Sequence, residues 1–99
     1  KTSNDVVNFY VNENLKKNTF FSKKKDQLII NKAFFEQPYE VIFRSISDSL
    51  KFVGKKYYPP RGKKLDVIVK KIKKKQLIIE TLAGCIIKKV NSTVIISKE

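Results

Sequence analysis

The fold is decided by residues 77–96, LIIETLAGCIIKKVNSTVII, which contain three β-prone runs separated by two turns. The runs cover residues 77–82, 85–90 and 94–96, with Ala83-Gly84 and Asn91-Ser92-Thr93 between them. Short apolar runs bounded by turn residues are typical of consecutive antiparallel strands. Because the aliphatic residues do not alternate cleanly with polar ones, we expect strands that are covered on both faces or packed beneath helices.

The best-specified helix precedes these strands, at residues 38–54. Pro38 is suited to a helix start, Glu40 to the positive first turn, and Gly54 to the end. One apolar stripe is formed by Ile42, Phe43, Ile46, Leu50 and Val53. The other faces carry Arg44, Ser45, Ser47, Asp48 and Lys51. We therefore expect an amphipathic helix with one buried side.

Two further helices and a hairpin complete the prediction. A first helix is expected at residues 5–16, after the capping residues Thr2 to Asp5, with Val7, Tyr10, Val11 and Leu15 at helical spacing. Residues 19–22 and 28–30 are β-prone and flank a polar stretch of hairpin length, residues 23–27. Leu65, Ile68, Val69 and Ile72 form another helical stripe. The whole predicts one α+β domain over residues 1–99, with about three helices, a short β-hairpin and a C-terminal antiparallel β-meander.

Positive charge is concentrated in one part of the chain. The net charge is +13, and eleven of the 22 Lys and Arg residues lie at positions 51–75, beside one acid, Asp66. Such a block attracts phosphate backbones through ion pairing and counterion release. A compositional bias toward lysine is the alternative, but a general bias would spread lysines evenly. The lysines of the third helix either meet an anionic partner or form a solvated face.

Composition excludes several classes of site. The chain has no histidine, which removes the usual general base and the commonest zinc ligand, so we expect neither hydrolytic triads nor zinc fingers. Its single cysteine, Cys85, lies among aliphatic residues and is expected in the core; one cysteine is consistent with a reducing cytoplasm. Apolar runs are too short to span a bilayer, which predicts a soluble protein. The chain starts at Lys1 and lacks methionine, so we expect a piece of a longer protein or a processed form.

Three stretches, taken in order, resemble one enzyme family. They are Gln37-Pro38-Tyr39-Glu40-Val41, then Val53-Gly54 with Tyr58-Pro59-Pro60-Arg61, and Thr81-Leu82-Ala83-Gly84-Cys85. Together they are similar to the region after the catalytic domain in tRNA(Ile)-lysidine synthetases (TilS, also called cell-cycle protein MesJ). The resemblance covers roughly residues 36 to 99.

The chain departs from this family's pattern at two places. Ala83 stands where the family usually has glycine, which predicts a backbone conformation open to a residue with a Cβ and so a different turn. Lys98-Glu99 replaces a terminal Arg-Glu. The family's Ser-Gly-Gly-x-Asp-Ser loop for ATP is absent from these residues.

The resemblance implies a non-catalytic domain that docks tRNA while an upstream nucleotide-binding domain of the parent enzyme attaches lysine to the wobble cytidine. ATP with Mg²⁺ and free lysine are implied for the parent, and no cofactor for this segment. Two alternatives remain: a stand-alone, sequence-tolerant RNA-binding module, and a structural scaffold with little RNA contact. No membrane partner is expected.

The candidate RNA contacts lie in the basic block. Arg61 is suited to bidentate phosphate binding, or it caps a turn or packs on Tyr58. Tyr57 and Tyr58 either stack on a base or anchor the proline turn. Lys23, Lys24 and Lys25 extend the surface or form a solvated loop, and Glu36 and Glu40 are assigned to the helix dipole. The predicted contacts are Lys51, Lys55, Lys56, Tyr58, Arg61, Lys63, Lys64, Lys70, Lys71 and Lys74.

Overall fold

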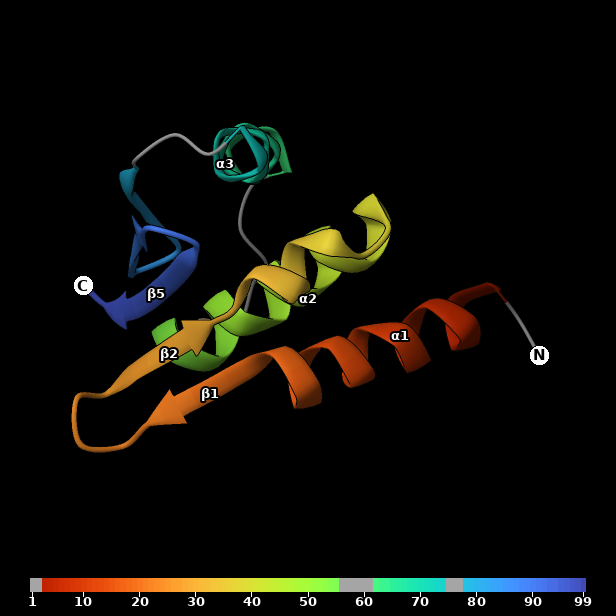
Figure 1. Ribbon diagram of the computed structural model, residues 1–99, viewed down its shortest axis with the longest axis horizontal. Helices are drawn as coiled ribbons and strands as arrows, with labels where there is room; N and C mark the ends of the chain where they lie inside the picture. Colours follow the sequence, from red (N-terminus) through yellow and green to blue (C-terminus); the bar gives the residue numbers. More distant parts are fainter. Residues whose placement is uncertain (1–2, 56–61, 75–77) are drawn as a thin grey trace.

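The computed structural model describes residues 3–55, 62–74 and 78–99 as an α+β domain (Figure 1). Three α-helices and a short 3₁₀ helix accompany one antiparallel sheet of five strands. The predicted fold class is therefore confirmed. The helices are α1 (Ser3–Asn18), η1 (Lys32–Glu36), α2 (Tyr39–Gly54) and α3 (Gly62–Lys73). The strands are β1 (Thr19–Ser22), β2 (Gln27–Ile30), β3 (Ile79–Leu82), β4 (Cys85–Val90) and β5 (Thr93–Lys98).

The sheet joins the two ends of the chain. Its strand order is β1-β2-β5-β4-β3, so the N-terminal hairpin pairs with the final strand of the C-terminal meander. The β2–β5 register places Ile29 opposite Ile95 and Ile30 opposite Val94. The sequence predicted the hairpin and the meander separately. That the hairpin and the meander pair to form one sheet was not predicted and is seen in the structure.

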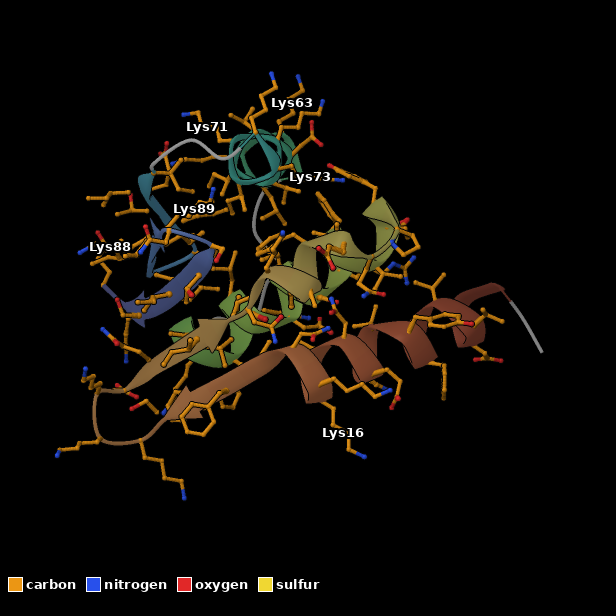
Figure 2. The ribbon with its side chains drawn as sticks, in the orientation of Figure 1. Lys16, Lys63, Lys71, Lys73, Lys88 and Lys89 are labelled. Carbon is orange, nitrogen blue, oxygen red and sulfur yellow. The ribbon has the colours of Figure 1, made fainter. Side chains whose placement is uncertain are left out.

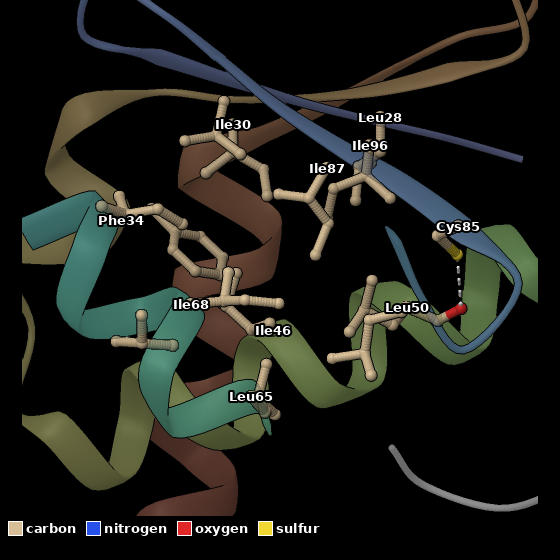
Figure 3. Packing of buried hydrophobic residues seen from close by; sticks show 14 of the residues in the cluster. Leu28, Ile30, Phe34, Ile46, Leu50, Leu65, Ile68, Cys85, Ile87 and Ile96 are labelled. Atoms are coloured by element: carbon tan, nitrogen blue, oxygen red, sulfur yellow. Dashed lines mark hydrogen bonds between the residues drawn. The ribbon is translucent and has the colours of Figure 1, made fainter. Parts of the chain in front are cut away.

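One face of the sheet packs under α2 and α3. Alternate strand residues, including Ile30, Ile87 and Ile96, are fully buried (Figure 3). The predicted stripe of α3, Leu65, Ile68, Val69 and Ile72, is buried throughout. On the opposite face Ile29, Ile86 and Ile95 are half-buried, whereas Phe20 and Ile79 are 66% and 71% exposed. Of the two expectations for the strands, packing beneath helices is correct and coverage of both faces is wrong.

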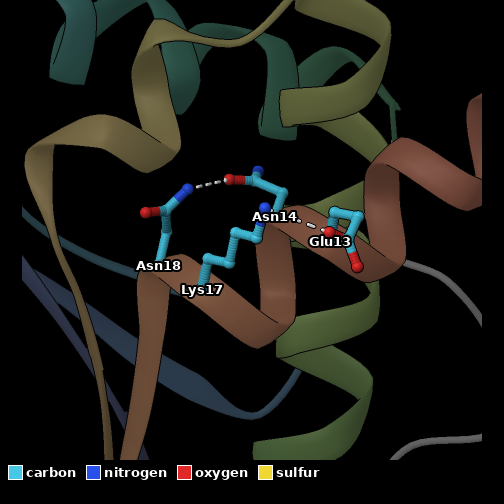
Figure 4. A network of polar contacts seen from close by, with 4 residues as sticks. All are labelled: Glu13, Asn14, Lys17 and Asn18. Carbon is cyan, nitrogen blue, oxygen red and sulfur yellow. Dashed lines mark hydrogen bonds and ion pairs between the residues drawn. The ribbon is translucent and has the colours of Figure 1, made fainter.

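A polar network fixes α1 against α2 and η1. Asn14, which is 2% exposed, donates from Nδ2 to Ser45 Oγ at 3.1 Å and to the Phe34 carbonyl at 3.4 Å. Asn18 Nδ2 donates to Asn14 Oδ1 at 2.8 Å, and Lys17 pairs with Glu13 on the same helix (Figure 4). The placement of Ser45 away from the buried side of its helix was wrong, because Ser45 is fully buried. Tyr10, which lies at helical spacing with the buried Val11, is 52% exposed. Asn14 takes an inward position because α2 and η1 supply it with acceptors.

The β3–β4 turn also differs from expectation. Ala83 has φ 55° and Gly84 has φ 76°, so both residues lie in the left-handed region. The expectation that Ala83 would adopt a conformation suited to a Cβ was wrong. Two consecutive residues with positive φ match the twist of a tight hairpin, and closure of the Leu82–Cys85 pair imposes this geometry on Ala83.

The strained turn gives a stability prediction. The left-handed conformation of Ala83 destabilises the folded state by about 1–2 kcal/mol, and replacement by glycine removes this cost. Glycine also gives the unfolded chain more backbone freedom, which offsets part of the gain. We expect the free energy of unfolding to rise by about 0.5–1 kcal/mol, measured as a higher midpoint of urea denaturation. A lower midpoint would show that the alanine methyl group contributes more through packing than its conformation costs.

Candidate nucleic-acid interface

Four of the ten predicted RNA contacts lie on the outer face of α3 or directly after its last residue. Helix α3 turns its apolar stripe into the core, and Lys63, Lys64 and Lys70 on its other side are exposed, as is Lys74 directly after the helix. Figure 2 shows Lys63 and Lys71 extending outward from α3, with Lys16 on α1 at the opposite side of the molecule. We call Lys63, Lys64, Lys70 and Lys74 the α3 lysine face. Its members were predicted because the apolar stripe of an amphipathic helix faces the core, so the lysines on the other side must face solvent.

Acidic side chains restrain two of the predicted lysines on α3. Lys70 Nζ lies 3.0 Å from the Asp66 carboxylate one turn earlier, and the Tyr39 hydroxyl donates to the same carboxylate. Lys71 Nζ lies 2.9 Å from Glu80 Oε2 and thereby joins α3 to β3. Exposed ion pairs contribute about 0–1 kcal/mol, so a phosphate can compete for Lys70. Lys71 is half-buried, and its side chain links two elements of the fold.

Two of the predicted residues lie on α2 and not on α3. Lys51 and Lys55 belong to the C-terminal end of α2, where Lys55 caps the helix in a left-handed conformation, with φ 55°. Lys51 Nζ lies 3.6 Å from Asp48 on the same helix. Lys56, Tyr58 and Arg61, together with Tyr57 and the two prolines, lie outside the described residues, so their assignment stays a prediction.

The other candidate residues lie in the core, in helices or in an exposed turn. Cys85 is fully buried and donates from Sγ to the Leu50 carbonyl at 3.4 Å, so its core assignment is confirmed (Figure 3). Glu40 lies in the first turn of α2 and pairs with Arg44 at 3.5 Å. Glu36 ends η1, a helix that the sequence did not predict. Lys23, Lys24 and Lys25 are exposed in the β1–β2 turn.

Sequence reasoning missed a second group of lysines. Lys32 after β2, Lys73 at the end of α3 and Lys89 in β4 line one hollow of about 420 Å³. The available signal was the alternation in β4. Counting by twos from the core residue Cys85 places Ile87 and Lys89 on the inner face, whereas Lys88 points outward.

Comparisons with protein-family models, with curated proteins and with solved structures gave no match to this chain. Within residues 3–55, 62–74 and 78–99, no helix has the length and apolar character needed to cross a bilayer. The same residues contain no group of three or more Cys, Asp or Glu side chains arranged to hold a metal ion.

Proposed function

We propose that this domain binds tRNA and carries out no chemistry of its own. The observation that supports the proposal is the α3 lysine face: three exposed lysines of one helix and Lys74 directly after it, with Asp66 as the one acid of the helix. An exposed Lys ammonium binds a phosphate as a point charge and tolerates variation in its position. A surface of this kind follows a sugar-phosphate backbone without reading the bases.

Structured RNA is the partner that best suits this surface. Double-stranded RNA is bound largely through its shape, its phosphates and its 2′-hydroxyl groups, because its deep major groove is closed to side chains. A rigid helix with cations along one side meets that requirement. The packed stripe of α3 holds the lysines at fixed spacings on the domain, which reduces the entropy lost on binding.

We further propose that the parent protein is a cytoplasmic tRNA(Ile)-lysidine synthetase. Support comes from the three quoted stretches and from their order. Two of them meet in the fold, since Gly54 packs against Ala83 and Cys85 at the β3–β4 turn. In this proposal an upstream domain holds ATP with Mg²⁺ and free lysine, and the present domain grips the tRNA.

A salt titration tests the binding proposal. We expect the 99-residue chain to bind isoleucine tRNA more tightly than a duplex DNA of similar length. The logarithm of its affinity should fall with the logarithm of salt at a slope that corresponds to roughly three to six phosphate contacts. Fluorescence anisotropy at several salt concentrations measures both quantities. Equal, weak binding to both nucleic acids would contradict the proposal.

A scaffold function is the second candidate, and the outer sheet face favours it. Phe20 and Ile79 are largely exposed there, and Ile29, Ile86 and Ile95 lie between them. A domain that positions a catalytic neighbour through this face would show the weak binding described above. The remaining alternative, a stand-alone RNA-binding module, makes the same binding predictions as the synthetase domain. The gene distinguishes them, because a stand-alone module would have no upstream nucleotide-binding domain.

A further inference from the structure

The hollow beneath the end of α3 has the composition of an anion site. It lies between η1, the C-terminal end of α3 and the β4–β5 turn. Its charged and polar lining consists of Lys32, Lys73, Lys89, Glu36, Asn91 and Ser92. Three ammonium groups against one carboxylate leave a net positive charge. Its volume of about 420 Å³ falls within the range of small-molecule sites, about 300–1,000 Å³.

Lys89 is the unusual member of this group. It is 8% exposed, although lysine is rarely buried without a partner. The inner-face carboxylate of the neighbouring strand, Glu80, is occupied by Lys71 at 2.9 Å. Within the described part of the chain, no carboxylate forms an ion pair with Lys89. Lys89 therefore adds to the positive charge of the hollow, where Glu36 is the one carboxylate of the described lining.

The backbone around Lys89 holds it in place. Its N–H donates to the Ile78 carbonyl at 3.1 Å, and Val94 on β5 lies beside it in register. Lys88, one residue earlier, is exposed on the outer face of the sheet (Figure 2). Two adjacent lysines thus have opposite surroundings, and the stem of one of them is buried beside a concave site. A lysine whose stem is already packed loses less conformational entropy on binding than a mobile surface lysine does.

The hollow also has an apolar side. Phe35, Ile72 and Val94 form this side. The Phe35 ring packs at 4.9 Å, centroid to centroid, against Phe34, which is fully buried. Aromatic side chains held in this way can stack on a nucleobase, which contributes about 1–3 kcal/mol. Across the hollow, the Ser92 hydroxyl is exposed and able to donate to a phosphate oxygen.

We propose that this hollow binds a nucleotide through a terminal phosphate. The phosphate lies against Lys89, with Lys32, Lys73 and Ser92 around it, and the base lies on Phe35. A phosphomonoester carries close to two negative charges at neutral pH, which suits three lysines better than a phosphodiester does. The ligand is a free nucleoside monophosphate or the phosphorylated end of an RNA chain. The site is separate from the α3 lysine face.

The test measures binding of adenosine 5′-monophosphate, adenosine and inorganic phosphate to the 99-residue chain by calorimetry. NMR shifts of Phe35 and Ser92 report the location. We expect the monophosphate to bind, inorganic phosphate to bind more weakly, and adenosine not to bind. Lys89→Met keeps the stem and removes the charge, and it should weaken monophosphate binding at least tenfold, as expected for one lost charge-assisted hydrogen bond. Lys88→Met is the matched control and should leave binding unchanged.

A second experiment distinguishes a phosphorylated RNA end from a free nucleotide as the ligand. It compares a ten-nucleotide RNA with a 5′-phosphate to the same RNA with a 5′-hydroxyl. Selective binding of the phosphorylated RNA identifies an RNA end as the ligand, whereas binding of the monophosphate without such selectivity identifies a free nucleotide. If Lys89→Met does not fold, the double variant Lys32→Gln, Lys73→Gln serves in its place, because both side chains are exposed. Failure of the monophosphate and of the phosphorylated RNA to bind in the hollow overturns the inference. That failure leaves tRNA binding by the α3 lysine face unaffected, so the two proposals fail separately.

Discussion

A variant with Lys63, Lys64 and Lys74 replaced by glutamate is expected to lose tRNA affinity by about 100-fold at 0.1–0.15 M salt, because about three phosphate contacts disappear. The slope of log affinity against log salt should decrease by about 2–3. These three lysines are exposed, and none of them forms an ion pair with another described residue. The substitutions should not unfold the domain, since glutamate at positions 63 and 64 lies in the favourable first turn of α3.

A charge-matched control separates the surface from the net charge. Replacing Lys16, Lys88 and Lys98 with glutamate changes the net charge by the same six units, at exposed positions away from α3. We expect this control to lose no more than about tenfold in affinity, through the general reduction in positive charge. Equal losses in the two variants would show that binding depends on total charge. In that case the α3 lysine face would not be the interface.

Replacement of Gly54 by alanine is expected to lower the free energy of unfolding by about 3 kcal/mol. A Cβ at this position would lie 2.5 Å from the Ala83 carbonyl oxygen and 2.9 Å from Cys85 Sγ. The first neighbour is backbone in a tight turn, so the C-terminal end of α2 and the β3–β4 turn must separate. That shift also lengthens the hydrogen bond from Cys85 to Leu50. Thermal denaturation should show a midpoint lower by about 10–20 °C.

Gly62 provides the control for this substitution. Among the described residues, a Cβ there would meet Phe43 Cζ at the ordinary contact distance of 3.9 Å and no closer atom. Gly62→Ala should therefore be neutral or raise stability by about 0.5 kcal/mol through helix propensity and reduced freedom of the unfolded chain. If Gly54→Ala were as mild as Gly62→Ala, the close contact between α2 and the β3–β4 turn would be wrong.

Local patterns were sufficient for most of the helices and strands. The stripes of α2 and α3 were predicted because their apolar residues recur at helical spacing, and a one-sided helix also determines which lysines face solvent. The hairpins were predicted from turn residues between β-prone runs. For the same reason, the α3 lysine face is the part of the candidate site that sequence reasoning located.

What the sequence did not reveal depends on contacts between distant residues. Nothing local indicates that β2 pairs with β5, since both are short aliphatic runs with several suitable partners. Asn14 is buried because α2 and η1 supply acceptors, which a helical pattern cannot show. The alternation in β4 indicates that Lys89 faces inward, but it does not show that Lys32 and Lys73, from other elements, line the same hollow. The hollow therefore appears only in three dimensions.

The position of β5 sets the order in which the domain can be assembled. β5 follows every other strand in the sequence, yet it lies in the middle of the sheet, between β2 and β4. The hairpin of residues 19–30 must therefore wait for a partner whose residues are synthesised more than sixty positions later. Until Thr93–Lys98 has left the ribosome, the inner edge of β2 stays unpaired and exposed to other chains. Folding during synthesis can form helices and hairpins, but the sheet is completed only by its last strand.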